Sequence, residues 1–189
     1  MDKVREHIAS LFKLSEGQAS IFLSEFTRKE FKKNDIFMES GKICNKIGLI
    51  ERGLMKCVFN KNGDEIIFEF AFENNFISDY YSFLTNTPSA KEIRCIEDTT
   101  VYVITRESLE RLGRDHPFIE SMSGQMNQML FLKMHDRLKS SLLDSAVERY
   151  IKLISERSDL VQRIPQYLIA SYLNIKPETV SRIRKKYII

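Results

Sequence analysis

The sequence predicts an α+β protein in which an antiparallel β-domain is followed by helices. Two observations lead to this prediction. Between residues 35 and 105 the apolar residues come in short runs rich in Ile, Val and Phe, separated by turn residues. After Thr105 the apolar spacing becomes that of a helix and stays so. Because many short strands without alternating helices favour a sandwich or barrel, a parallel sheet is not expected.

The composition is that of an ordinary folded protein. Of the 189 residues, 43% are hydrophobic and 29% are charged, which suits one large or two small domains. No apolar run approaches the roughly 18 residues that span a bilayer, and the N-terminus lacks an apolar signal-peptide core. We therefore expect a cytoplasmic location. Three scattered cysteines without a CxxC pair argue against a disulfide framework and a cysteine-held metal site.

The charge is distributed unevenly along the chain. Residues 1–132 carry 17 Lys and Arg against 20 Asp and Glu, whereas residues 133–189 carry 12 against 6. A basic tail module can be a solvated surface or the contact for a polyanion, and charge alone leaves both interpretations open.

Two short helices are expected before residue 26. Ile8, Leu11 and Phe12 have helical spacing, and so do the apolar residues of 21–26. Ser15 and Gln18 have the spacing of a capping box, which would begin the second helix.

The region from 35 to 105 predicts a series of strands. Asn62-Gly63 stands between two strand-like runs, and both residues tolerate positive φ, so a hairpin is expected there. The strands are expected at residues 36–38, 47–50, 54–59, 66–72, 93–96 and 101–105.

A short helix over 106–113 and then a long helix are expected after the strands. Thr105 is a suitable N-cap for the short one, and Pro117 is placed to open the long one. Around residues 129–132 the long helix is apolar on all sides, so it must be covered from two directions. A second copy of the helix in a homodimer, or burial of both faces within one chain, would do this, and we favour the dimer. The residues expected on the dimer helix are Met122, Met126, Met129 and Leu130.

The last 26 residues predict a helix, a short turn and a second helix. Before them, residues 141–145 are expected to form a hinge and 146–155 another helix. Pro165 would open the first helix of the pair, Asn174 would supply the left-handed turn, and Pro177 would begin the second helix.

The second helix has two opposed faces. At 100° per residue, Val180, Ile183 and Tyr187 point one way and can pack on the preceding helix. The opposite face carries an acceptor, a hydroxyl and cations, which are the groups that read base edges in the major groove. This pattern predicts double-stranded DNA as a partner. The expected DNA-binding residues are Lys176, Glu178, Thr179, Ser181, Arg182, Arg184, Lys185 and Lys186.

The segment 177–182, Pro-Glu-Thr-Val-Ser-Arg, resembles the recognition-helix motif of the Crp/Fnr transcription regulators. By this match Glu178 and Arg182 inherit base-reading roles, while Pro177 replaces an Arg that the family often has. The turn motifs at 39–41, 50–53 and 62–65 also resemble those of the family. The resemblance implies a jelly-roll-like β-roll of the cyclic-nucleotide-binding type (1–113), a dimerisation helix (114–140) and a helix-turn-helix domain (141–189). It also implies RNA polymerase as a further partner.

The effector site departs from the family pattern. Cyclic-AMP-binding members have Gly-Glu for the ribose and Arg-Ser or Arg-Thr for the phosphate, whereas this chain has Ser78-Asp79 and Ser89-Ala90. Burying a phosphate without its Arg is costly, so we expect that cyclic AMP is not the effector. Lys91 could replace the Arg only as a point charge, and nearby aromatic residues would suit an apolar effector or fill the pocket themselves. The residues of this weakly indicated pocket are Ser78, Asp79, Tyr80, Ser89, Ala90 and Lys91.

Other family cofactors are not expected either. No cysteine precedes Cys44, where the oxygen sensors of the family hold an iron–sulfur cluster, and the lone His7, His116 and His135 do not indicate haem. After Lys186 too few residues remain for the family's β-hairpin wing, so the wing is expected to be truncated or missing.

An enzyme is not expected, because the sequence has no Gly-rich phosphate loop, paired-His metal motif or G-x-S-x-G elbow. A dimeric regulator is favoured, and the alternative is a small-molecule sensor module that acts through protein partners. The operator, the sign of regulation and the effector do not follow from the sequence.

Overall fold

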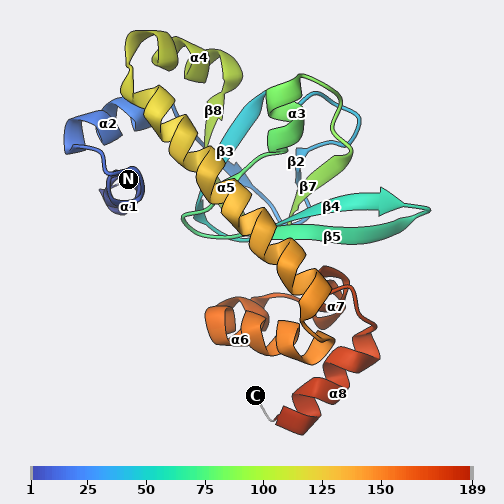
Figure 1. Cartoon of the computed structure of the whole chain (residues 1–189). Helices are drawn as coiled ribbons and strands as arrows, with labels where there is room; N and C mark the ends of the chain where they lie inside the picture. The colour runs from blue at the N-terminus through green and yellow to red at the C-terminus, as the bar shows by residue number, and fades with distance from the viewer. Residues whose placement is uncertain (1, 188–189) are drawn as a thin grey trace.

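The computed structural model describes residues 2–187, with the side chains of 156–160 and 187 excepted. A β-domain with flanking helices lies at one end of the molecule, a cluster of C-terminal helices at the other, and one long helix joins them (Figure 1). None of the helices described is long and apolar enough to cross a membrane.

The chain begins with the two expected helices, α1 (Asp2–Phe12) and α2 (Glu16–Ser24). The capping box before α2 is confirmed: the Gln18 N–H donates to Ser15 Oγ at 3.2 Å, and the Ser15 N–H donates to Gln18 Oε1 at 2.9 Å. These contacts satisfy two backbone groups that a helix start leaves without partners.

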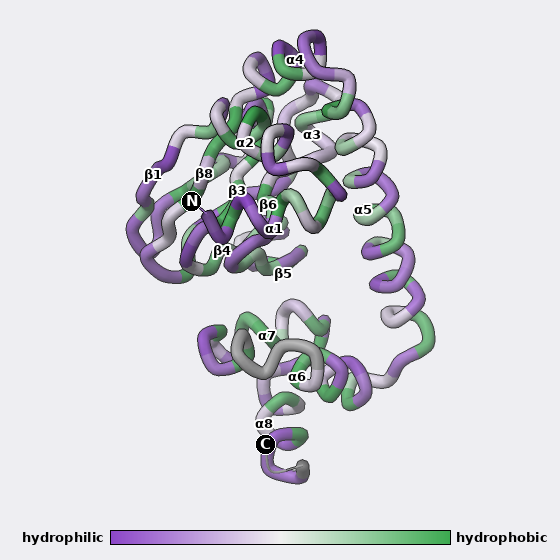
Figure 2. The backbone as a smooth tube through the Cα atoms, turned by 90° about the vertical axis from the view of Figure 1, so that its left-hand side faces the viewer, coloured by the Kyte–Doolittle hydropathy of each residue, from purple (hydrophilic) through white to green (hydrophobic). Residues whose placement is uncertain are grey.

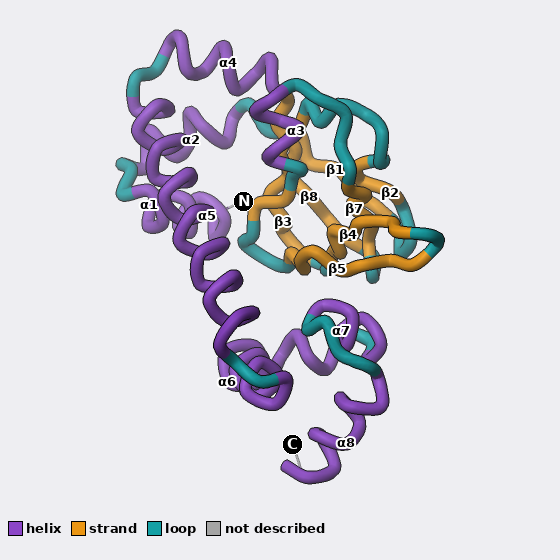
Figure 3. The backbone as a smooth tube through the Cα atoms, turned by 45° about the vertical axis from the view of Figure 1, so that its right-hand side comes forward, coloured by secondary structure: helices purple, strands orange, loops and turns teal. Residues whose placement is uncertain are grey.

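The described strands form two antiparallel four-stranded sheets, in the orders β1-β8-β3-β6 and β2-β7-β4-β5. Figure 3 shows them as the strand layers beside the long helix. All six expected strands are present. Their bounds, with those of two further strands, are β1 (Thr27–Phe31), β2 (Ile36–Met38), β3 (Lys46–Arg52), β4 (Met55–Lys61), β5 (Asp64–Ala71), β6 (Phe76–Ile77), β7 (Lys91–Cys95) and β8 (Thr99–Thr105).

The sequence missed β1, β6 and the short helix α3 (Tyr80–Thr85). Strand β1 has the sequence TRKEF and exposes its first four residues, so it carries no apolar alternation. Strand β6 has only two residues. These elements owe their structure to their neighbours in the fold rather than to a local pattern.

The expected hairpin joins β4 to β5, with φ of 55° at Asn62 and 90° at Gly63. The space between the sheets is filled by apolar residues that include Cys44, Cys57 and Cys95, all reduced and buried. Burial raises the pKa of Cys57 to about 12 and that of Cys95 to about 11. These two thiols are therefore neutral core residues.

Two helices follow the β-domain, α4 (Arg106–Asp115) and α5 (Phe118–Leu143). Thr105 caps α4 as expected, since its side chain accepts from the Ser108 N–H at 3.2 Å. Pro117 occupies the position directly before α5.

Three helices complete the chain: α6 (Ala146–Arg163), α7 (Gln166–Tyr172) and α8 (Pro177–Tyr187). Helix α6 is longer than the expected 146–155, and the break from α5 is confined to Asp144 and Ser145. Residues 188 and 189 lie outside the described residues, so the truncated or missing wing stays a prediction.

Candidate nucleic-acid interface and effector site

Helices α7 and α8 pack through the apolar residues that the sequence indicated. Val180 and Ile183 of α8 are 0% and 4% exposed, and they join one core cluster with Ile169, Ala170 and Leu173. Tyr187, expected on the same face, has a side chain outside the described ones.

The turn between α7 and α8 has the expected left-handed residue, Asn174, with φ of 53°. Its N–H donates to the Ser171 carbonyl at 3.1 Å, and the Ile175 N–H donates to the Ala170 carbonyl at 3.0 Å. Arg149 of α6 donates to the Leu173 carbonyl at 3.1 Å, at the C-terminal end of α7. The turn is thus stabilised by its own backbone hydrogen bonds and by a contact from a third helix.

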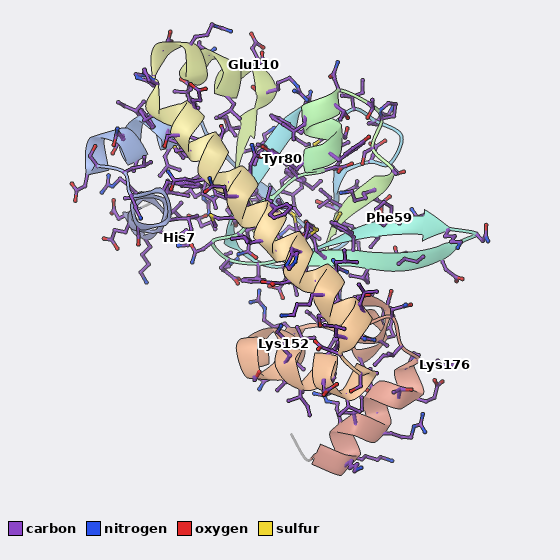
Figure 4. The ribbon with its side chains drawn as sticks, in the orientation of Figure 1. His7, Phe59, Tyr80, Glu110, Lys152 and Lys176 are labelled. Atoms are coloured by element: carbon purple, nitrogen blue, oxygen red, sulfur yellow. The ribbon has the colours of Figure 1, made fainter. Side chains whose placement is uncertain are left out.

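The outer face of α8 is polar and open. Arg182 is exposed, and its guanidinium donates to the Thr179 hydroxyl at 3.3 Å. Among the residues that the structure describes, no salt bridge involves Arg182 or Lys185. Figure 4 shows Lys176 at the start of α8, on the outer surface. The exposed residues of the expected set are Lys176, Glu178, Arg182, Lys185 and Lys186, and the half-buried ones are Thr179, Ser181 and Arg184.

Helix α5 turns one face towards its own β-domain and leaves another uncovered. Met122 is 5% exposed in the protomer's own core, so it is not available to a dimer seam, which corrects its assignment to the dimer face. Met126 and Leu130 are half-buried and face the β-domain, and Met129 is 40% exposed.

The uncovered face of α5 is an apolar stripe, defined by Phe131, Leu138 and Leu142. These side chains are 69%, 60% and 73% exposed, and they follow one another at the spacing of a coiled-coil seam. In Figure 2 this half of α5 runs along the edge of the molecule with no other element beyond it. The exposure contradicts the alternative in which one chain buries both faces of the helix.

Three residues of the expected effector pocket form one buried polar cluster. Asp79 is 1% exposed, and its Oδ1 lies 2.7 Å from Lys91 Nζ. The Ser89 hydroxyl donates to Asp79 Oδ2 at 2.5 Å and accepts from the Lys91 N–H at 3.0 Å. Lys91 Nζ also lies 4.4 Å from the centroid of the Phe68 ring. Asp79 and Lys91 therefore neutralise each other inside the domain.

The other three residues of that set do not join the cluster. The Ser78 hydroxyl donates to the Lys46 carbonyl at 3.0 Å, and Ala90 is exposed. The Tyr80 hydroxyl donates to Asn127 Oδ1 on α5 at 2.7 Å. Ser78 and Tyr80 instead line a separate cavity between α5 and the β-domain.

Comparison with known proteins assigns the β-domain. Residues 28–116 match the cyclic nucleotide-binding domain family. These residues form a cyclic nucleotide-binding domain. No curated protein is significantly similar to the chain in sequence.

Solved structures extend the likeness to the whole chain. The c-di-GMP-responsive global regulator CLP of Xanthomonas campestris is 15% identical, with a TM-score of 0.70 over 92% of this chain and 91% of CLP. A protein described as a Crp/Fnr transcriptional regulator from Eubacterium rectale is 16% identical, with a TM-score of 0.69 over 93% and 84%. The catabolite activator protein of Thermus thermophilus is 19% identical, with a TM-score of 0.60 over 94% and 86%. The chain therefore has the α+β fold of the Crp/Fnr transcription regulators, outside its cyclic nucleotide-binding domain as well as within it.

The sequence did not indicate two residues through which α5 contacts this domain. Asn127 and Lys133 of α5 face the cyclic nucleotide-binding domain, where Lys133 Nζ lies 2.8 Å from Glu69 Oε2. The helical spacing showed where α5 runs, but the side that packs on the domain depends on neighbours distant in sequence.

Proposed function

We propose that the chain is a dimeric, DNA-binding transcription regulator of the Crp/Fnr type that reads a palindromic operator through α8. The observation that supports this proposal best is the division of α8 into two faces. Val180 and Ile183 are buried against α7, while the opposite face presents Glu178, Arg182 and Lys185 to solvent. A helix held this way fits the major groove.

The chemistry of the outer face supports base reading. Arg can donate to guanine O6 and N7 together, and Glu can accept from cytosine N4. Arg182 follows Glu178 by four residues, so the two side chains lie one helical turn apart on the same face. Arg184 and Lys186 flank that face and suit phosphate contacts, which position the helix without reading sequence.

A dimer would allow the protein to recognise a palindromic operator. Two copies related by a two-fold axis place their recognition helices on half-sites about 34 Å apart, or one DNA turn. The apolar stripe on α5 is the surface proposed for that contact. In this proposal the sensor domain comprises residues 1–113, the dimerisation helix 114–140 and the DNA-binding domain 141–189. Helix α5 itself spans Phe118–Leu143.

The effector in this proposal is not cyclic AMP, because Asp79 and Lys91 already form an ion pair at 2.7 Å where family members hold the phosphate. A cyclic phosphate would meet one neutral hydroxyl, from Ser89, and a like charge, from Asp79.

The proposal is tested by measuring binding to the operator that a genome-wide pull-down with the protein recovers. Arg182→Ala should cost about 1–3 kcal/mol of binding free energy on that operator in a gel shift, and relax the preference at one base position. Lys29→Ala removes one exposed charge from β1 and is the matched control, with no such effect expected. An equal loss on operator and random DNA would show that Arg182 contacts only phosphate.

A further inference from the structure

We propose that a cavity between α5, the N-terminal helices and the β-domain binds a small uncharged aromatic molecule that carries one hydrogen-bonding oxygen. The cavity has a volume of about 300 Å³. An engineered apolar cavity of about 150 Å³ holds benzene, so this one has room for one or two rings. The site goes beyond the proposed function and does not rest on it.

The walls of the cavity favour an aromatic guest. Phenylalanine rings line it from α1, from α2 and the link that follows it, from β6 and from α3, and Met122 and Met126 face it from α5. Aromatic rings pack edge-to-face with other rings, and methionine sulfur adds favourable contacts with ring edges. The lining phenylalanines are Phe12, Phe22, Phe26, Phe76 and Phe83.

One polar pair in the cavity can orient the guest. The Tyr80 hydroxyl donates to Asn127 Oδ1 at 2.7 Å. Figure 4 places Tyr80 beside α5, between the β-domain and that helix. This bond leaves the Asn127 amide group as a donor and the Tyr80 oxygen as an acceptor. A single hydroxyl on the guest could use both.

The charges at the cavity favour a neutral guest. The two ionic side chains that line it, Glu69 and Lys133, are paired at 2.8 Å. An ionised ligand head would have to break that pair or stay unpaired, and both outcomes cost free energy.

The cavity is distinct from the position of the cyclic phosphate. None of Asp79, Ser89 and Lys91 is among the residues that line it. A guest would instead touch α3 through Tyr80 and α5 through Asn127. It would therefore connect the cyclic nucleotide-binding domain with the helix that leads to α6, α7 and α8.

The experiment titrates the full chain with 2-naphthol, a two-ring phenol, and follows the heat of binding by calorimetry. We expect saturable binding of one molecule per chain. Tyr80→Phe keeps the ring and removes the hydroxyl, and should weaken binding roughly five-fold, the effect of one neutral hydrogen bond. Tyr81→Phe is the matched control, because Tyr81 is 70% exposed and does not line the cavity, and it should bind as wild type does.

A second variant tests the location independently. Ser123 lines the cavity from an exposed position on α5, so Ser123→Phe should obstruct the cavity and abolish binding, with thermal unfolding confirming that the variant is folded. Absence of saturable binding to wild type, or equal binding to a folded Ser123→Phe, overturns the inference. Operator binding by the wild-type chain, measured separately, would leave the proposed function intact in that case.

Discussion

Asp79, Ser89 and Lys91 form a buried polar cluster that bears on whether a cyclic nucleotide can bind. In the family pattern, the corresponding positions offer the ribose a carboxylate and the phosphate a guanidinium. Here the carboxylate and the ammonium lie 2.7 Å apart, and Asp79 is almost completely buried. Breaking such a pair leaves a buried charge without its partner, at a cost of about 3–5 kcal/mol. A cyclic nucleotide would have to offset that cost before it gained affinity.

Calorimetry with millimolar cyclic AMP and cyclic GMP should therefore show no saturable heat. Lys91 is held by Asp79 and by the Phe68 ring, so it offers no free ammonium to a phosphate. A clear micromolar isotherm would contradict this prediction. Lys91→Met would then show whether Lys91 is the phosphate partner, because that substitution removes the charge and keeps most of the apolar stem.

At the scale of elements, α5 shows what a sequence pattern can predict and what it cannot. The three- and four-residue spacing predicted a long helix after Pro117, and the helix is present. Its residues 129–132 are apolar on all sides. The pattern did not indicate which side faces inward. That choice is made by α1, α2 and the β-domain, which bury Met122 and leave Phe131 exposed. A helix that is apolar all round contains no local signal that separates the two sides.

Helix α8 is the contrasting case, because its local signals agree with one another. A proline at the start, a left-handed Asn in the preceding turn and a one-sided apolar set all indicate the same packing. The inner residues could therefore be named from the sequence. The contact from Arg149 could not, since it joins residues 24 apart through a backbone carbonyl.

The apolar stripe predicts the effect of new charges on the dimer. Phe131→Glu with Leu138→Glu should give monomers in analytical sedimentation and weaken operator binding, because an unpaired charge in an apolar seam is costly. Gln125→Glu adds a charge to α5 about a third of a turn away from the stripe and should leave the dimer intact. A dimer that persists in the double variant would place the interface on another surface.

At the scale of the whole molecule, the C-terminal helices are docked on the cyclic nucleotide-binding domain. Leu54, Val58 and Ile67 of that domain share one core cluster with the residues of α6, α7 and α8. The Ser171 hydroxyl of α7 accepts from the Ile67 N–H at 3.1 Å. The partners lie 104 residues apart, so no local pattern could have indicated this contact.

Arg163, the last residue of α6, adds an ionic clamp to that docking. Its guanidinium donates to both carboxylate oxygens of Glu73 at 2.9 Å and to Glu97 at 2.5 Å. Burial alone would raise the pKa of Glu73, but hydrogen bonds from Arg163 and from the Gly53 N–H outweigh it and lower the pKa. The stabilisation is therefore present above the pKa of Glu73 in the unfolded chain, and it is lost as the pH falls through the lower, folded-state value.

Glu73→Gln should accordingly loosen the docked helices at neutral pH, and the effect should fade in acid. A hydrogen bond to a charged group contributes about 1.5–3 kcal/mol, so amide hydrogen exchange in α6 and α7 should quicken by roughly tenfold or more. Exchange in α1 and α2 should not change. Glu69→Gln is the matched control, because its partner Lys133 is 56% exposed and such pairs contribute little. Wild type and Glu73→Gln should differ fully at pH 7, and the difference should begin to shrink as the pH falls below about 4, since an ordinary Glu titrates near there and the Glu73 pKa is lower still. A difference that persists unchanged into that acidic range would show that the clamp does not depend on the Glu73 charge.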